Sequence, residues 1–472
     1  DVESRGLGDV YKRQIFGVIY MSSVKNLIKQ PYPFLDEPID IYELDNGHTV
    51  ILAHKDSEML NISTWVKTGS INEDDSNTGI SHFLEHLMFK GTKRFKAGYF
   101  DRTLESRGAI INAGTSKDYT FYYITIPNLD DNLDIAIDLH SDMMLNACFP
   151  DEEIGPSFDF SKEVPSEKRE RYVVLEEIKM CEDRPWSRTY EQLNAEMYKK
   201  HSYKRKVIGT SEVIASVPRE IIYDYYASHY VPSNMTTIVV GDFDKEKVLN
   251  SILEKFSFDE KRNSQKPLFV QREQEDEQTE TRYVESTHSV NTGFLMFGYK
   301  CAPANDMKNT LIMDIIGVVL GDGTSSRLYK NLVEQPENPV FNIIDTSNYA
   351  LRDGNNFYVQ ANFDASRKDD AIAQVKEQVQ NVLDEQITDD EFEKAKKKLK
   401  IRFAELSETV SEIGETIGFN ITVCDDVSSL NDYLKTLDFI TKEDVKETAR
   451  KYLDINKATI SVIMPEGAGE NE

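Results

Sequence analysis

The sequence lacks a long apolar run. A membrane-spanning helix needs roughly 20 apolar residues, and no segment of the 472 residues is that long. The stretch IFGVIYM at 15–21 is too short, and no small-residue cleavage site follows it, so we predict no signal peptide. We therefore expect neither a membrane segment nor a membrane partner.

Cysteine is also scarce. The four cysteines, Cys148, Cys181, Cys301 and Cys424, lie far apart in the chain and form no CxxC pair. This spacing excludes a zinc ribbon and a small disulfide scaffold. We expect reduced thiols that pack in the interior, Cys181 among them, and hence a cytoplasmic protein.

Basic residues are few relative to acidic ones. The chain has 55 Lys and Arg against 82 Asp and Glu, which gives a net charge of −27. Such a surface repels phosphate backbones, so nucleic acid is excluded as a partner. Solubility alone accounts for the charge, although an acidic surface also favours basic or neutral peptides. Hydrophobic residues make up 39%, as in an ordinary globular protein.

The length predicts more than one domain. Residues 1–20 read as non-native sequence ahead of Met21, so they are excluded from the fold. Residues 258–281 are rich in Glu, Gln, Lys and Arg, which predicts a solvated linker. The predicted division is an N-terminal extension over 1–37, a catalytic domain over 38–257, a charged linker over 258–281 and a second, non-catalytic domain over 282–472.

Strand and helix patterns alternate irregularly. IDIYELDNGHTVILAHK predicts a hairpin that turns at 45–47, and NISTWVKTG alternates like a half-buried strand. The second half runs through a similar order of elements, and its final strand, ATISVIMPEG, resembles MTTIVVGDF. This indicates a weak internal repeat of roughly 220 residues. Without a regular βαβ alternation, we predict an α+β fold with sheets layered by helices.

The segment SHFLEHLMFK carries two histidines and a glutamate at a spacing that suits a metal. We expect a helix capped by Ser76 or Asn77. Residues four apart share a helix face, so His82 and His86 can bind one zinc ion at about 2.0–2.1 Å. Glu85 can then act as the general base for water attack on a peptide carbonyl. This is the HExxH arrangement reversed. A helix with two surface histidines is the plainer alternative, but burying such residues in so apolar a helix is costly without partners.

Catalytic zinc usually takes three protein ligands, so a third ligand is expected downstream. In RERYVVLEEIKMCEDRP, Glu170 and Glu177 fall on one helix face, while Glu176 points away. We assign Glu177 as the third ligand and Glu170 as a support for the ligands. Salt bridges to Arg169 or Lys179 would explain the same face without a metal.

These segments resemble one known family. SHFLEHLMFKGT, INAGTSKDYTFYY and RERYVVLEEIKMCEDRP together are similar to the pitrilysin and mitochondrial processing peptidase family, the zinc metallopeptidases with an HxxEH motif. VIGTSEVI, HYVPSNMTTIVVGDFD and LGDGTSSRLY extend the similarity from about Pro38 to the C-terminus. The resemblance implies two homologous α/β-roll domains, each a mainly antiparallel sheet layered with helices.

The resemblance also implies a function. The chain would be a zinc-dependent endopeptidase with one Zn²⁺ per chain. His82, His86 and Glu177 would bind the zinc, Glu85 would be the base, and Glu170 would support the ligands. Asn112 and Ala113 would lie on an edge strand, where a substrate peptide adds as another strand. Family members enclose unfolded peptides or presequences in a chamber. A chain of this size would supply half of that chamber, which implies a dimer.

Two features depart from the family pattern. The gap from His86 to Glu177 is 177 − 86 = 91 residues, longer than usual, and we place the excess in the loop GPSFDFSKEVPS. In the second half, Val333 and Phe341 stand where the family carries an Arg and a Tyr that bind substrate and steady the oxyanion. Neither can donate a hydrogen bond. The hypothesis is that a paralogous subunit supplies the Arg and Tyr.

Two rival functions share part of this sequence pattern. A non-catalytic or weakly active partner subunit of the same fold is one, although such subunits commonly lose the HxxEH residues that are all present in this chain. The other is S-ribosylhomocysteine lyase, which uses the same short signature but is a much shorter, single-domain protein. The length and the downstream similarity exclude it.

Overall fold

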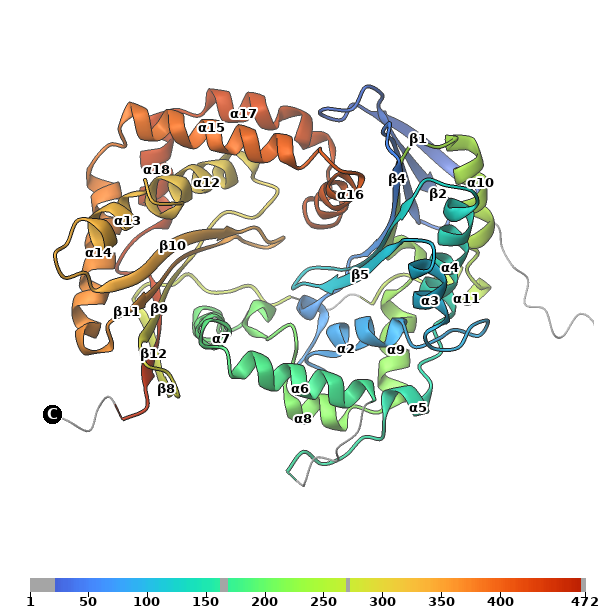
Figure 1. Cartoon of the computed structure of the whole chain (residues 1–472), viewed down its shortest axis with the longest axis horizontal. Helices are drawn as coiled ribbons and strands as arrows, with labels where there is room; N and C mark the ends of the chain where they lie inside the picture. Colours follow the sequence, from blue (N-terminus) through green and yellow to red (C-terminus); the bar gives the residue numbers. More distant parts are fainter. Residues whose placement is uncertain (1–21, 162–168, 269–271, 468–472) are drawn as a thin grey trace, which may run out of the picture.

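The computed structural model describes residues 22–161, 169–268 and 272–467. The interpretation of residues 1–20 as non-native lies outside these ranges, as does part of the loop predicted to carry the insertion. The described residues form two mixed sheets, each layered with helices (Figure 1), which confirms the predicted α+β class.

The first sheet has seven strands in the order β1-β2-β3-β7-β4-β6-β5. Neighbouring strands are antiparallel except β3 and β7. Since β1 pairs with β2, the sheet begins before the predicted domain start at residue 38. The strands are β1 (Val24–Gln30), β2 (Ile39–Leu44), β3 (Thr49–His54), β4 (Met59–Val66), β5 (Ile110–Thr115), β6 (Thr120–Pro127) and β7 (Met235–Gly241).

The second sheet repeats this topology. Its order is β10-β11-β9-β12-β8, and only β8 and β12 are parallel. Read from the other end, it matches the β3-β7-β4-β6-β5 part of the first sheet strand for strand, with β12 in the place of β7. The strands are β8 (Arg282–His288), β9 (Gly293–Lys300), β10 (Phe341–Tyr349), β11 (Asn356–Phe363) and β12 (Thr459–Pro465).

Helices cover both sheets. Among the helices of the described ranges, none is both long enough and apolar enough to cross a bilayer. The helices are α2 (Ile80–Met88), α3 (Tyr99–Glu105), α4 (Asn132–Asn146), α5 (Asp151–Ile154), α6 (Glu170–Glu182), α7 (Pro185–Met197), α8 (Ser211–Ser216), α9 (Arg219–His229), α10 (Lys245–Lys255), α11 (Glu260–Ser264), α12 (Met307–Gly321), α13 (Arg327–Tyr329), α14 (Lys368–Asp384), α15 (Asp389–Glu405), α16 (Val410–Phe419), α17 (Tyr433–Phe439) and α18 (Lys442–Tyr452).

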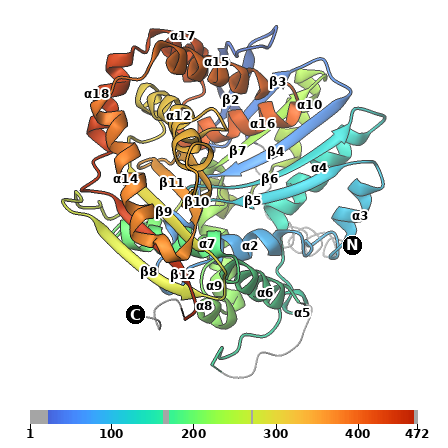
Figure 2. The same ribbon diagram turned by 60° about the vertical axis from the view of Figure 1, so that its left-hand side comes forward.

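The two halves exchange one helix each. α7 precedes the second sheet in sequence but packs on β8, β9 and β12, whereas α16 follows the second sheet and packs on β4 and β7 of the first. Figures 1 and 2 both show α7 beside the second sheet and α16 beside the first. Each sheet is therefore covered on one face by a helix from the other half, and the two halves share their cores.

This exchange corrects the prediction for NISTWVKTG. Seven of the eight residues of β4 are buried, so the strand is not half-buried as its alternation indicated. Its polar face lies under α16, where Asn61 Nδ2 donates to Ser411 Oγ at 3.4 Å and to Thr125 Oγ1 at 3.0 Å. Asn61 of the pattern is thus hydrogen-bonded across the contact between the two halves.

The contact of α16 with the first sheet depends on two glycines. A methyl group added at Gly418 would come within 2.0 Å of the Trp65 ring, and one at Gly414 within 2.6 Å of the Asn61 side chain. We expect Gly418→Ala to lower the free energy of unfolding by about 1–3 kcal/mol, because overpacking forces the helix off the sheet. Urea denaturation measures the change. Gly317→Ala in α12 is the matched control, since its methyl group meets nothing closer than 3.6 Å; equal stability of the two variants would contradict the prediction.

The segment predicted to be a solvated linker is partly folded, so that prediction is wrong for its first part. Residues 260–264 form α11, and Arg262 is buried, where Nη1 donates to the carbonyl oxygen of Leu145 at 2.7 Å. Farther along, the Glu275 carboxylate accepts hydrogen bonds from three successive backbone N–H groups at 199–201. These charged side chains can pack against the fold because backbone groups from other parts of the chain form hydrogen bonds with them.

Candidate metal centre

Helix α2 carries the HxxEH residues and is fixed at its N-terminus from outside. The cap is Gly79, with φ of 89°, and not Ser76 or Asn77 as predicted. The buried carboxylate of Glu73 accepts hydrogen bonds from the N–H groups of Gly79 at 2.7 Å and of Ser81 at 2.9 Å. An anion at this end also suits the helix dipole. A side chain at Gly79 would collide with the backbone of Gly209, so only glycine fits.

Helix α6 brings Glu177 to the two histidines. Its Oε2 lies 3.4 Å from His86 Nε2 and 3.7 Å from His82 Nε2. The three donor atoms lie within 4.8 Å of one another. The Arg171 guanidinium, buried at the start of α6, donates to the carbonyl oxygen of Val217 at 2.9 Å and so anchors the helix.

This donor set fits zinc. Bonds of about 2.0–2.1 Å to a tetrahedral ion place neighbouring ligand atoms about 3.4 Å apart. The Glu177 carboxylate oxygen lies 3.4 and 3.7 Å from the two histidine nitrogens, and all three atoms lie within 4.8 Å of one another. Two imidazole nitrogens and one carboxylate oxygen are ligands that zinc accepts in catalytic sites, which keep one position open. The carboxylate and both rings therefore need little movement to hold one ion.

Glu170 lies behind His86. Its Oε2 is 3.2 Å from His86 Nδ1, and Lys90 Nζ lies 2.5 Å from its Oε1. A carboxylate on the second ring nitrogen fixes the orientation of a metal-binding histidine and raises its basicity. Glu170 and Glu177 contact residues outside α6, namely His82 and His86 on α2 and Lys90 just beyond its end, so salt bridges along α6 are not needed to explain their shared face.

The two imidazoles differ in charge. Burial and the neighbouring His86 lower the pKa of His82 to about 4, against the attraction of Glu177. Burial would also lower the pKa of His86, but its hydrogen bonds to Glu170 and Glu177 outweigh this and raise the pKa to about 9. The hydrogen bond from His86 lowers the pKa of Glu177. The two carboxylates thus favour a proton on His86, and a bound metal cation would have to displace it.

Glu85 lies on α2 beside the histidines and is oriented by strand β5. Thr115 Oγ1 donates to Glu85 Oε2 at 2.8 Å. Burial raises the pKa of Glu85, while this hydrogen bond lowers it. A half-buried carboxylate with one oxygen held by a hydroxyl group has its other oxygen available as a proton acceptor.

A cleft of about 1280 Å³ opens beside the three donors. His82, Glu177 and Thr115 line it together with Met296 and Gln360 of the second sheet. Cys181 also lines it and is only partly buried, so the prediction that this thiol packs in the core is wrong. One turn beyond Glu177, it faces the cleft and not the interior.

The predicted substrate residues lie on an edge. Strand β5 is the last strand of the first sheet, and the side chain of Asn112 is exposed. The backbone N–H of Ala113 donates to Asn112 Oδ1 at 2.9 Å. The strand edge therefore offers backbone groups to an added strand. In the second half, Phe341 is 2% exposed and Val333 packs on the same core, so neither provides a polar group.

Three neighbours of the site were missed from the sequence. Lys90 had a signal, since it follows His86 by four residues in sequence and lies just beyond the end of α2. Glu73 and Thr115 had none, because a cap from a preceding loop and a hydroxyl from a distant strand leave no local pattern. Glu73 holds the start of α2 in place, and Thr115 holds Glu85 in place.

Comparison with known proteins gives consistent matches. Residues 49–211 match the model described as insulinase, peptidase family M16, and residues 216–399 match the peptidase M16 inactive domain. An uncharacterized zinc protease of Rickettsia felis is 25% identical over 88% of this chain and 95% of its own. The beta subunit of the Dictyostelium discoideum mitochondrial-processing peptidase is 27% identical over 51% of this chain and 50% of its own. A crystal structure of a Helicobacter pylori protease superposes with a TM-score of 0.79 at 24% identity, covering 94% of this chain and 100% of that one.

The chain has two similar halves that exchange one helix each, and a pair of histidines lies in the first half. The relatives that match both halves are named zinc proteases. More particularly, the chain belongs to peptidase family M16, and this confirms the resemblance to pitrilysin and the processing peptidases.

Proposed function

We propose that this chain is a zinc-dependent endopeptidase. The observation that carries the proposal is the convergence of His82 Nε2, His86 Nε2 and Glu177 Oε2 within 4.8 Å of one another. These residues would hold one Zn²⁺ per chain, with Glu170 as support. When bound, zinc supplies a Lewis acid that activates water and polarises the carbonyl of the peptide bond.

Glu85 acts as the general base. It takes the proton of the attacking water and returns it to the leaving amine, while Thr115 holds one of its oxygens. Burial favours this role, since it raises the pKa of the Glu85 carboxyl toward the range where a carboxylate accepts a proton effectively.

Unfolded peptides or presequences are the proposed substrates. An extended peptide would pair with β5 at Asn112 and Ala113, and backbone pairing gives affinity without a strict choice of side chain. The exposed edge and the adjoining cleft support this pose. The net charge of −27 disfavours nucleic acid and favours neutral or basic peptides.

We also propose a dimer, because the family resemblance implies that a chain of this size supplies half of the substrate chamber, and because Val333 and Phe341 provide no polar group. A paralogous partner would supply the Arg and Tyr, in which case the chain alone is weakly active. The halves are proposed to correspond to the domains at 38–257 and 282–472. The four free cysteines favour a cytoplasmic protein.

Metal removal tests the function. We expect about one zinc per purified chain, peptide cleavage that stops with a chelator, and recovery when zinc is returned, because the base has no activated water without the ion. Zinc analysis measures the metal content, and a peptide digest measures the cleavage. Light scattering shows whether the chain is a dimer. Cleavage that persists in metal-free protein would refute the peptidase mechanism, and full activity as a homodimer would refute the paralogous partner.

A further inference from the structure

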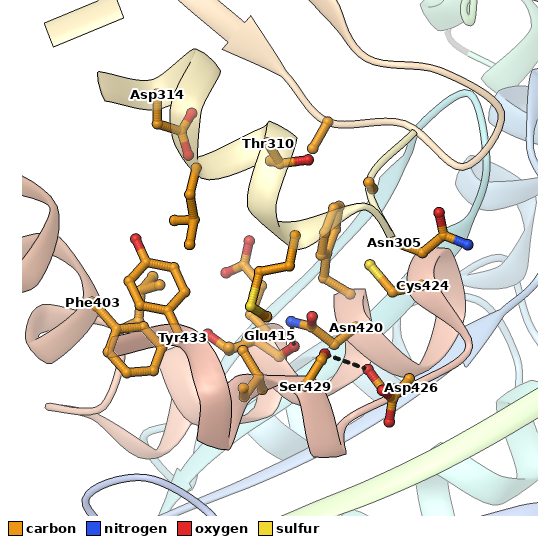
Figure 3. Close-up of a pocket in the computed structure, with 18 of the residues that line it drawn as sticks. Asn305, Thr310, Asp314, Phe403, Glu415, Asn420, Cys424, Asp426, Ser429 and Tyr433 are labelled. Atoms are coloured by element: carbon orange, nitrogen blue, oxygen red, sulfur yellow. Dashed lines mark hydrogen bonds between the residues drawn. The ribbon is translucent and has the colours of Figure 1, made fainter. Parts of the chain in front are cut away.

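A second cavity lies where the two halves meet, away from the metal centre. Its volume is about 640 Å³, within the roughly 300–1,000 Å³ of small-molecule sites. Helices α12 and α16 and the segment 420–433 form much of its wall (Figure 3), and Trp65 of β4 and Tyr119 of the β5–β6 turn also line it. No residue lines both this cavity and the metal cleft, within the residues that the structure describes.

Aromatic rings line the cavity on two sides. On one side, the Tyr119 ring lies 4.9 Å from Trp65 and 6.2 Å from Phe419. On the other, Phe403 and Tyr433 stack with their ring centres 4.0 Å apart. The rings come from both halves of the chain, so an occupant would touch both. Aromatic faces attract organic cations through the negative potential of the ring.

Every ionised side chain that lines the cavity is acidic. The lining has no lysine, arginine or histidine among the described residues, and its carboxylates are Asp314, Glu412, Glu415 and Asp426. Such a lining repels anions and attracts cations. A metal ion is a poor fit, because it needs several oxygen atoms within 2–3 Å, and among the described residues these carboxylates do not gather into a group of three ligand atoms.

Asp314 is the carboxylate deepest in the wall. Asn348 Nδ2 donates to its Oδ1 at 2.8 Å, and within the described part of the chain no group donates to its other oxygen. The side chain points from α12 toward Tyr433 (Figure 3). Burial raises the pKa of Asp314 to about 6, although Asn348 and Arg402 oppose this. Asp314 is partly buried, and its second oxygen can accept a hydrogen bond from a ligand.

We propose that this cavity binds a small organic cation: a protonated amine whose ammonium group pairs with Asp314 and whose apolar body lies against the aromatic rings. A protonated amine with an apolar body suits both the carboxylate and the aromatic walls of the cavity, whereas a neutral ligand leaves the carboxylate unpaired. The cavity spans both halves, so the ligand holds α16 and α12 to the first sheet. The proposal does not depend on peptidase activity.

The test compares three ligands of equal length. Octylamine, octan-1-ol and octanoate are titrated into the full chain by calorimetry at neutral pH. We expect one octylamine per chain, bound at least about tenfold more tightly than octanol because of the charge-assisted hydrogen bond and the cation–π contacts, and no binding of octanoate. Equal binding of amine and alcohol, or binding of octanoate, would overturn the proposal.

Substitutions assign the site. Asp314→Asn keeps the size of the side chain and should weaken octylamine at least about tenfold, without changing octanol. Asp345→Asn is the matched control, because Asp345 is also a carboxylate bonded to a side-chain amide, that of Gln360 at 2.6 Å, but it lies outside the cavity. Leu406→Trp fills the cavity from its partly exposed rim and leaves Asp314 intact, so it should abolish binding even if Asp314→Asn fails to fold. Unchanged octylamine affinity in Leu406→Trp would refute this location.

Discussion

Glu85→Gln is expected to lower kcat by about 10²- to 10⁴-fold, the range that a general base contributes. The amide cannot accept a proton from water, but it has nearly the size of the carboxylate and can still accept the hydrogen bond from Thr115 Oγ1, now 2.8 Å away. The histidines and Glu177 are unchanged, so the zinc content should stay at the wild-type level. Peptide hydrolysis under saturating substrate, with zinc analysis of the same sample, measures both quantities.

The control for this variant is Glu105→Gln. Glu105 is an exposed glutamate at the end of α3, so its change should leave kcat, KM and zinc content alone. A Glu85→Gln enzyme with wild-type kcat would show that another group accepts the proton. A variant that has lost its zinc would instead assign Glu85 to metal binding, which its position next to Thr115 does not favour.

Sequence patterns predicted the elements of the fold that depend on residues close together in the chain. The turn at 45–47 joins β2 to β3 as expected. The matching order of the final strands β7 and β12 reflects the predicted repeat. Each of these features depends on neighbours in sequence, through turn residues or an amphipathic period.

The exchanged helices could not be predicted in this way. An amphipathic period shows that a helix has an apolar face, but it does not say which sheet that face meets. For β4 the alternation of polar and apolar residues predicted one exposed face, and α16, some 350 residues later in the chain, covers it. The same limit applies to Arg262, whose charge predicted solvent although distant carbonyl groups receive it.

In the candidate site, too, the residues that share a helix could be predicted from the sequence, and the residues brought in by tertiary contacts could not. Spacing within α2 placed His82, Glu85 and His86 together, since one helical turn decides it. The choice of Glu177 over Glu176 followed from the face of α6 and agrees with the side-chain positions, because Glu176 is exposed. Which distant groups complete the site, Glu73 at the helix end and Thr115 at the base, depends on tertiary contacts that no spacing encodes.

Glu177→Gln is expected to lower zinc affinity by more than the about 10- to 100-fold that is typical when a partner outside the coordination shell is removed. The amide loses the negative charge that offsets the cation and is a weaker ligand than the carboxylate, which now lies 3.4 Å from His86 Nε2. Glu170→Gln should fall within that about 10- to 100-fold range, because it acts through His86. Competition against a chelator of known affinity gives the three dissociation constants.

The order of these affinities separates two explanations of the same helix face. If Glu177 and Glu170 serve only as salt-bridge partners of the histidines, both substitutions change the unfolding free energy and leave zinc binding equal. If Glu177 is a ligand, its substitution weakens zinc most, Glu170→Gln comes second, and Glu176→Gln, exposed on the same helix, changes nothing. Wild-type zinc affinity in Glu177→Gln would place the third ligand elsewhere and remove the chemical basis of the proposed hydrolysis, since two imidazoles from one helical turn rarely hold a catalytic zinc without a third protein ligand.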